Sequence, residues 1–269
     1  MLQIEARIHD VMIGSRIKPF LCSLHVALPG LTDLRGSLVR AFRGALKTPK
    51  TFGLAALKHI TLRDDRALLD VGGADGQSVA SMRFHLSRLP IVSFEPNPFF
   101  AARIKSRFRN DAAVRVESMA LSDEDGEFPL YIPVYKYTAF PDLGTLERSE
   151  AENWLCSRIL GYDPDALTVL EFPCKCRRLD ALGMEPGLIN IDCRCNPSKV
   201  LEGACATILE YKPAIILETA ILAEACVRLV REVGYRGFRC SGNGIREVQP
   251  TEPCDLLLTD SNAACIPAC

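Results

Sequence analysis

A turn rich in small residues offers the clearest chemistry in this sequence. The apolar run Ala67–Val71 leads into the turn, and a stretch that can start a helix follows it. Strand, small-residue turn and helix together bring backbone N–H groups close to a nucleotide-like ligand. Glycine tolerates a positive φ and lets a ligand approach the chain. The candidate binding residues of this turn are Asp70, Gly72, Gly73, Ala74, Asp75, Gly76 and Ser78.

The spacing of the turn, Asp-x-Gly-x-Ala-x-Gly, narrows the choice of ligand. It differs from the Gly-x-Gly-x-x-Gly of dinucleotide-binding enzymes, so an NAD-linked dehydrogenase is disfavoured. An acid just before the first glycine suits a ligand that carries a positive charge there, such as a methionyl ammonium. A glycine-rich turn without any ligand is the alternative, because short motifs also match by chance.

A second acid stands at the end of the next apolar run. Pro90–Glu95 has the pattern of a buried strand, and Glu95 lies 23 residues after Gly72. An acid at that separation and at a strand end suits hydrogen bonds to both hydroxyls of a ribose. Asn97 follows at the turn before the next helix. We therefore expect Glu95 and Asn97 to join the glycine turn in one binding site.

The rest of the chain alternates between short apolar runs and helical patterns. This alternation predicts a mostly parallel sheet with helices on both faces, whose ligands bind at the carboxyl ends of the strands. Two further acids, Asp123 and Asp192, fall at such ends. The expected strands are 67–71, 90–95, 113–116, 128–132, 172–177, 187–192, 213–218, 237–240 and 254–259, and the expected helices are 78–89, 99–108, 198–210 and 220–233.

Two segments stand outside this alternation. Residues 1–66 hold eleven Lys or Arg and five Asp or Glu, and apolar residues recur at helical spacing from Leu38 to Leu46. They predict an N-terminal helical extension, residues 1–62, before a Rossmann-like domain, residues 63–269. Its basic residues indicate a solvated helix face, with docking on an anionic membrane or substrate as the alternative. The aromatic-rich residues 133–165 predict either a cover over the ligand site or an insertion packed by its own side chains.

The composition is that of a globular protein without a strong charge preference. Of 269 residues, 48% are hydrophobic and 24% charged, and the formal net charge of -1 gives no reason to expect nucleic acid as a partner. No apolar run reaches the roughly 18 residues of a membrane span, and the first residues lack the pattern of a signal peptide. We therefore expect a cytoplasmic protein without a transmembrane segment.

Twelve cysteines are many for such a chain. In the cytoplasm they are free thiols or metal ligands more often than disulfides. Cys174 with Cys176, and Cys193 with Cys195, form Cys-x-Cys pairs that put both sulfurs on one face of a strand. Four such thiolates would bind zinc if the two faces met. Because this spacing is unusual for zinc, we expect buried free thiols and no metal site.

Four stretches in this order resemble the FkbM family of S-adenosylmethionine-dependent methyltransferases. The resemblance covers roughly Leu69 to Glu218. It implies the Rossmann-like class I methyltransferase fold, S-adenosyl-L-methionine as cofactor, and methyl transfer, commonly to a hydroxyl of a sugar or small-molecule acceptor. The stretches are Leu69–Ser78, Phe94–Pro98, Ala120–Asp123 with Gly126, and Ile189–Asp192 with Val200–Ala204.

The resemblance also implies roles for individual residues. Asp70 and the backbone of residues 72–76 would hold the methionyl end of the cofactor, and Glu95 its ribose. Asp192 would act as the base or orient the acceptor, since positioning the acceptor and removing its proton are what such a transfer needs from the protein. An acid that caps the following helix is the alternative for Asp192. The residues implied for the adenine are Ala120, Leu121 and Asp123.

The loop after the last of these strands departs from the family pattern. Where the family has Asp-Val-Glu-Gly and a later acid, residues 192–197 are Asp-Cys-Arg-Cys-Asn-Pro. Asn190 also replaces the usual Lys, and Ala74 replaces an Asn of the glycine turn. Arg194 would pair with Asp192 and make it a poorer base, or bind an anionic acceptor. Two hypotheses follow: an active O-methyltransferase, or a methyltransferase-like binding or regulatory protein that keeps the fold, and perhaps the cofactor, without catalysis.

Overall fold

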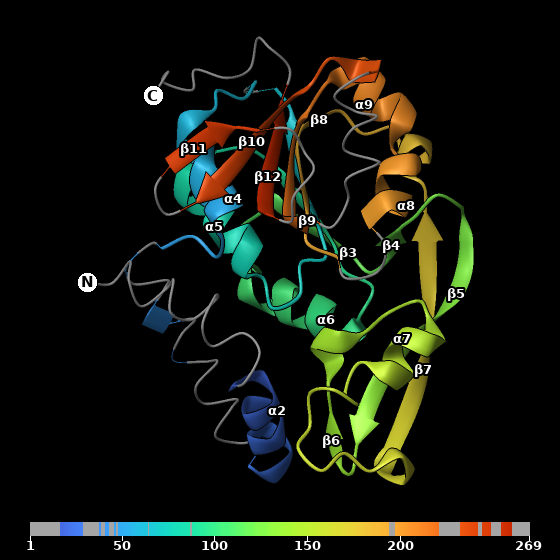
Figure 1. Ribbon diagram of the computed structural model, residues 1–269. Coiled ribbons are helices and arrows are strands. Elements are labelled where there is room, and N and C mark those ends of the chain that lie inside the picture. The colour runs from blue at the N-terminus through green and yellow to red at the C-terminus, as the bar shows by residue number, and fades with distance from the viewer. Residues whose placement is uncertain are drawn as a thin grey trace. The chain divides into compact units, whose positions relative to one another are not determined.

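The computed structural model describes residues 17–28, 38, 41–42, 46, 48–63, 65–86, 88–193, 197–220, 232–241, 244–248 and 254–259. The chain divides into two compact units, whose elements are labelled in Figure 1. The smaller unit contains residues 1–42 and 129–173, and the larger contains residues 43–128 and 174–269.

The larger unit is built on an eight-stranded sheet. In chain order its strands are β1 (Ala67–Val71), β2 (Ile91–Phe94), β3 (Val114–Glu117), β8 (Pro186–Ile191), β9 (Ala214–Ala220), β10 (Arg236–Ser241), β11 (Gly244–Glu247) and β12 (Cys254–Thr259). Their order across the sheet is β11-β10-β12-β9-β8-β1-β2-β3. Neighbours from β3 to β9 pair in parallel, while β12 runs antiparallel to both β9 and β10.

This strand order places a topological switch point between β1 and β8. The chain starts at β1 in the middle, proceeds to one edge through β2 and β3, and then continues on the other side of β1 with β8 and β9. Ligands of such sheets bind outside the carboxyl ends of the strands at this point. The order, with one reversed strand between β9 and β10, is that of the Rossmann-like class I methyltransferase fold, so the predicted α/β fold class is confirmed.

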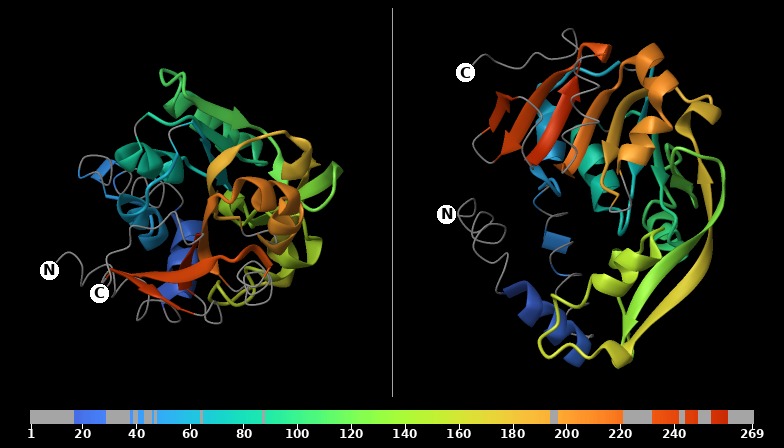
Figure 2. Two further views of the ribbon diagram at one scale, coloured as in Figure 1. Left: turned by 90° about the horizontal axis from the view of Figure 1, so that it is seen from above. Right: turned by 45° about the vertical axis from the view of Figure 1, so that its right-hand side comes forward.

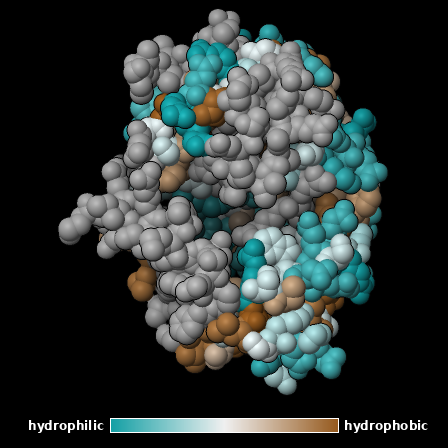
Figure 3. All heavy atoms as spheres, in the orientation of Figure 1, coloured by the Kyte–Doolittle hydropathy of each residue, from teal (hydrophilic) through white to brown (hydrophobic). Residues whose placement is uncertain are grey.

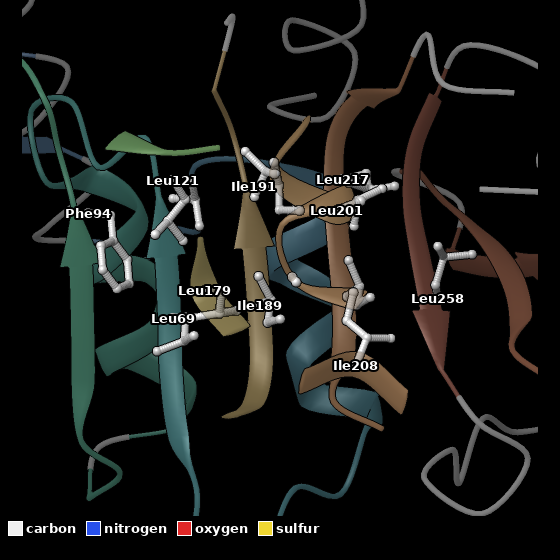
Figure 4. Packing of buried hydrophobic residues seen from close by; sticks show 14 of the residues in the cluster. Leu69, Phe94, Leu121, Leu179, Ile189, Ile191, Leu201, Ile208, Leu217 and Leu258 are labelled. Carbon is white, nitrogen blue, oxygen red and sulfur yellow. The ribbon is translucent and has the colours of Figure 1, made fainter. Parts of the chain in front are cut away.

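Helices cover both faces of this sheet. On one face lie α4 (Phe52–Ala55), the 3-10 helix η2 (Ala56–His59), α5 (Gln77–His85) and α6 (Pro98–Arg107), and on the other lie α8 (Pro197–Glu202) and α9 (Cys205–Tyr211). Each face of the sheet has its own core cluster, the first under α4, η2, α5 and α6 and the second under α8 and α9. Successive residues of a strand point to opposite faces, so Leu68 belongs to the first cluster and Leu69 to the second. In Figure 4, Leu201 of α8 and Ile208 of α9 lie against the strand residues of the second cluster.

The expected single helix over residues 198–210 is wrong, because two helices occupy this segment. The break lies at Gly203, where a Cβ would come 1.9 Å from the carbonyl oxygen of Ser122. Asp180 then stabilises the start of α9, since its carboxylate accepts hydrogen bonds from the N–H groups of Ala206 and Thr207 at 3.1 and 2.8 Å. The hydrophobic period of the sequence does not reveal this close approach to a distant loop.

The smaller unit has a core of its own. It contains α2 (Ile17–Ala27), β6 (Thr138–Ala139), α7 (Arg148–Asn153) and most of β5 (Gly126–Tyr135) and β7 (Leu167–Arg177). β5 and β7 are neighbours in a four-stranded sheet ordered β4-β7-β5-β6, in which β4 is Ala120–Leu121, and Figure 2 shows them side by side. The outer side of β5, β7 and α7 is mostly hydrophilic in Figure 3. The buried residues of the core are Tyr135, Phe140, Leu143, Leu155 and Ile159.

This core supports one of the two interpretations of residues 133–165, the insertion packed by its own side chains, while the cover over the ligand site stays a prediction. The segment packs by its own side chains, which include the stacked rings of Tyr135 and Tyr162 at a centroid distance of 5.3 Å. Residues 128–132 and 172–177, expected as short strands, belong to the longer strands β5 and β7. Most of their extra length, residues 133–135 and 167–171, lies in this unit, where the weak hydrophobic pattern predicted no strand.

Some sequence-based expectations fall outside the described residues. Residues 221–231, which make up most of the helix expected over 220–233, are among these, and so is most of the segment between Leu38 and Leu46. Of that segment, Leu38, Ala41, Phe42 and Leu46 are described, and all four are helical. The division into an extension of residues 1–62 and a domain of residues 63–269 stays a prediction. In the described part of the chain, no helix has the length and apolar character needed to cross a membrane.

Candidate functional site

The glycine turn joins β1 to α5, and its backbone conformation needs glycine at two positions. Gly72 and Gly76 have φ values of 87° and 77°, which residues with a side chain rarely adopt. A Cβ on Gly72 would also lie 2.5 Å from the carbonyl oxygen of Asp192. The Asp192 N–H donates a hydrogen bond to the carbonyl of Val71 at 2.9 Å. The loop after β8 therefore rests directly on the first glycine of the turn.

Two other residues of the turn show how the backbone is arranged. A Cβ on Gly73 would lie 2.2 Å from the Ser93 hydroxyl oxygen, so only glycine fits there. The Gly73 N–H makes no hydrogen bond to the described residues. The carboxylate of Asp75 accepts hydrogen bonds from the backbone N–H and the side-chain amide of Gln77, at 3.3 and 2.8 Å, and so stabilises the start of α5. The Gly73 N–H is thus a donor available to a ligand in the turn.

A buried polar network lies on the sheet face that α5 covers. Asp70 is in register with Ser93 of β2 and with Asn190 of β8. Its carboxylate accepts hydrogen bonds from the hydroxyl of Ser93 at 3.0 Å, from the amide of Asn190 at 3.1 Å and from the hydroxyl of Ser78 at 2.9 Å. Asp70 is fully buried, and this burial raises its pKa. In this structure Asp70 holds the strand ends and the start of α5 together, and its predicted contact with a cofactor stays a prediction.

The amide of Asn190 leaves one acceptor of this network unsatisfied. Asn190 is fully buried, and its Oδ1 has no hydrogen-bond partner within the described residues. An unpaired buried acceptor costs about 1–3 kcal/mol. The network is therefore able to accept one more donor beside Asp70.

Glu95 joins the end of β2 to the glycine turn. One oxygen of its carboxylate accepts a hydrogen bond from the Ala74 N–H at 2.7 Å, and the other accepts one from the Asn97 N–H at 2.8 Å. The side chain of Asn97 in turn caps the start of α6. Glu95 is 5% exposed, and burial, aided by the negative charges of Asp70 and Asp192, raises its pKa to about 7. Each carboxylate oxygen has two lone pairs, so Glu95 keeps acceptor capacity for a ligand.

Lys50 provides a cation at the same edge of the sheet. Its ammonium binds the carboxylate of Asp192, and its backbone N–H donates a hydrogen bond to the hydroxyl of Ser81 in α5 at 2.9 Å. Sequence reasoning missed this residue, because 142 positions separate it from Asp192 and no motif includes it. Arg194, the partner predicted for Asp192, lies outside the described residues.

Asp123 lies beside α8. Its carboxylate accepts a hydrogen bond from the Ser122 hydroxyl at 2.9 Å and lies 3.8 Å from the ammonium of Lys199. Ala120 and Leu121 are buried in β4, which pairs with β7. In the part of the chain that the structure describes, no hydrogen bond or ion pair joins Asp123 to the glycine turn. The adenine site that these three residues were expected to form stays a prediction.

The cysteines were considered as metal ligands because of their two Cys-x-Cys pairs. Cys174 and Cys176 are buried in β7, Cys193 is half-buried, and Cys195 lies outside the described residues. No three His, Cys, Asp or Glu side chains within the described ranges are placed so that they could hold a metal ion.

The strand order, the glycine turn and the acids around it are those of a Rossmann-like class I methyltransferase fold. No protein-family model and no curated protein matches the chain. Among solved structures it is similar to the methyltransferase FkbM from Methylobacillus flagellatus KT, with 14% identity and a TM-score of 0.45 over 73% of this chain and 44% of that one. This agrees with the resemblance seen in the sequence, and the chain spans less than half the length of that structure.

Two further methyltransferase structures are also similar. One is precorrin-6y C5,15-methyltransferase from Geobacter metallireducens GS-15, with 13% identity and a TM-score of 0.38 over 77% of this chain and 84% of that one. The other is a SAM-dependent O-methyltransferase from Thermotoga maritima, with 11% identity and a TM-score of 0.36 over 78% and 63%.

Proposed function

We propose that this protein binds S-adenosyl-L-methionine at the glycine turn and methylates a hydroxyl oxygen of a sugar or another small molecule. The observation that supports this most is the hydrogen bond between Glu95 and the N–H of Ala74. It brings the acid at the end of β2 against the glycine turn after β1, the strand that borders the switch point of the sheet. An acid in that place suits the two hydroxyls of a ribose.

The residues at this edge fit the proposed ligand. Glu95 has lone pairs left for hydroxyl donors, and the Gly73 N–H has no partner in the described structure. Three acids, Asp70, Glu95 and Asp192, lie at or next to the ends of β1, β2 and β8. Above its pKa of about 7, the ionised carboxylate of Glu95 favours a positively charged ligand. When bound, the cofactor supplies an activated methyl group on its sulfonium.

The chain itself has to orient the acceptor and receive its proton. Asp192 is our candidate for this role, because it follows β8 directly and lies on Gly72. Lys50 binds the Oδ2 oxygen of its carboxylate, which leaves Oδ1 for an acceptor hydroxyl. A hydroxyl donating to Oδ1 would be held in place, and the same oxygen would take its proton during transfer.

Calorimetry with S-adenosylmethionine and S-adenosylhomocysteine tests the binding half of this proposal. We expect dissociation constants in the micromolar range for the unmodified protein and affinity at least about tenfold weaker for Glu95→Ala, since one good hydrogen-bonded pair to a charged group contributes about 1.5–3 kcal/mol. Glu127→Ala is the matched control, because Glu127 is an exposed glutamate of β5. If neither ligand binds, the proposal fails.

A binding or regulatory protein without catalysis is the second candidate. It is favoured by the altered loop at residues 192–197 and by the Lys50 ammonium that already occupies the carboxylate of Asp192. A screen of sugar and small-molecule hydroxyl acceptors with methyl-labelled cofactor separates the two. Label transfer to any acceptor excludes the second candidate, while cofactor binding with no transfer across the screen favours it.

A further inference from the structure

The edge of the sheet that carries the candidate site holds three acids, and Lys50 is the cation that pairs with one of them. Arg107 of α6 also lies at the turn, where its guanidinium donates a hydrogen bond to the carbonyl oxygen of Asp75 at 3.3 Å. Among the described residues, the carboxylates of Asp70, Glu95 and Asp192 meet at the ends of three neighbouring strands. They act on one another, since the charges of Asp70 and Asp192 both contribute to the raised pKa of Glu95. The positive charge of Lys50 acts in the opposite direction on Asp70, because it lowers the pKa that burial raises.

Lys50 is fixed in place by its neighbours. Its N–H donates a hydrogen bond to the hydroxyl of Ser81, which in turn donates to the carbonyl of Gln77, in the first turn of α5, at 2.7 Å. The next residue, Thr51, caps α4 by accepting a hydrogen bond from the N–H of Leu54 at 3.3 Å. Leu54 is fully buried. The backbone of Lys50 is therefore tied both to the helix that starts at the glycine turn and to the core.

The ion pair of Lys50 and Asp192 borders the glycine turn. The carbonyl of Asp192 approaches Gly72 so closely that a Cβ there would lie 2.5 Å away. The side chains of Lys50 and Asp192 are 21% and 27% exposed, so the pair lies at the surface of the site and not in the core. A charged ligand bound to the turn would experience the field of this pair across a short distance.

We infer that Lys50 sets the charge of the cofactor site, and with it the preference between positively charged S-adenosylmethionine and its product, whose sulfur is uncharged. This inference rests on the proposed function. With Lys50 present, the negative charge of Asp192 is neutralised. Without it, an unpaired carboxylate attracts the sulfonium and has no such effect on the product. Lys50 is thus a positioning residue that keeps the affinities for cofactor and product close.

The ratio of the dissociation constants of S-adenosylhomocysteine and S-adenosylmethionine, measured by calorimetry, tests this inference. We expect Lys50→Met to raise the ratio about fivefold, the effect of one charge several ångströms away in a partly solvated site. Lys50→Arg keeps the charge and should keep the ratio. Lys58→Met is the matched control, because Lys58 is an exposed lysine of the neighbouring helix η2 and its loss changes the net charge equally.

Asp192→Asn provides a second variant with the opposite expectation. It leaves Lys50 without its partner, so the ratio should fall below that of the unmodified protein, and it serves the test even if Lys50→Met does not fold. An unchanged ratio in Lys50→Met, or an equal rise in Lys58→Met, overturns the inference while the proposed function stands. Failure of the unmodified protein to bind either ligand overturns both.

Discussion

The carboxylate of Glu95 accepts a hydrogen bond of 2.7 Å from the N–H of Ala74 and so links the end of β2 to the middle of the glycine turn. Burial raises the pKa of this carboxyl to about 7. The carboxyl of Glu95 therefore gains or loses its negative charge near neutral pH. Two measurable properties depend on that charge, the free energy of unfolding and the affinity for a ligand that donates hydrogen bonds to Glu95.

The first prediction concerns the pH dependence of stability. The pKa of Glu95 is about 7 in the folded protein against 4.5 for a free glutamate, so the folded state binds the proton more tightly. The resulting stabilisation is complete below pH 4.5 and is lost as the pH rises to about 7, a change of about 3 kcal/mol. Glu95→Gln cannot ionise and should lack this loss. Urea unfolding of both proteins at several pH values measures it.

An exposed glutamate supplies the control for that experiment. Glu127→Gln removes a carboxyl that is open to solvent. Its unfolding free energy should follow that of the unmodified protein across the same pH range. Parallel curves for Glu95→Gln and the unmodified protein would show that the Glu95 carboxyl does not titrate in this window.

The second prediction concerns ligand binding. Hydroxyl groups of a ribose donate hydrogen bonds best to an ionised carboxylate. With a pKa of about 7, the ionised fraction of Glu95 rises roughly tenfold between about pH 6 and pH 8, and the affinity for S-adenosylhomocysteine should rise with it. Glu95→Gln should bind more weakly and without this dependence. A flat pH profile for the unmodified protein would contradict a direct role of Glu95 in binding.

The central strands could be predicted from sequence because their burial leaves a strong signal. Val71 and Phe94 end short apolar runs that the structure confirms as β1 and β2. Glu95 was recognisable as well, since its distance from Gly72 follows from the length of one helix and one strand. Local patterns of this kind survive folding because the sheet is covered on both faces.

Contacts between distant segments could not be predicted in the same way. Ser93 and Asn190 are polar residues in apolar strands, and these were the signs of the network around Asp70. Nothing in the sequence pairs Lys50 with Asp192, because each is an ordinary charged residue and their contact depends on how α4 packs. The break at Gly203 likewise follows from a neighbouring loop.

The third prediction compares two glycines with positive φ. Gly72→Ala introduces backbone strain and a Cβ only 2.5 Å from the carbonyl oxygen of Asp192. Gly183 has a similar positive φ of 59°, but a Cβ added there would have no atom within 4 Å. We expect about 1 kcal/mol of destabilisation for Gly183→Ala, from strain alone, and at least about 3 kcal/mol for Gly72→Ala. Urea unfolding measures both. Equal losses would mean that the loop after β8 does not rest on the turn.

The fourth prediction concerns the network around Asp70. Asp70→Ala leaves the amide of Asn190 and two hydroxyls without their acceptor and should cost about 3 kcal/mol of stability. Asp70→Asn should cost about 1 kcal/mol, because the amide of Asn190 can turn so that its unpaired Oδ1 accepts a hydrogen bond from the new amide. Thermal and urea unfolding distinguish the two variants. Equal destabilisation would show that the Asn190 oxygen cannot be used in this way.

The last prediction concerns the reactivity of the thiols, for which two effects compete. The neighbouring thiol of Cys174 lowers the pKa of Cys176 through a hydrogen bond, which favours its reactive thiolate, but both residues are buried in β7. Cys156 and Cys205 are exposed. Because a reagent must first reach the sulfur, burial should dominate. In the native protein iodoacetamide should label Cys156 and Cys205, while Cys174 and Cys176 react only after denaturation. Mass spectrometry of the labelled peptides measures this, and rapid native labelling of Cys176 would show that this end of β7 opens readily.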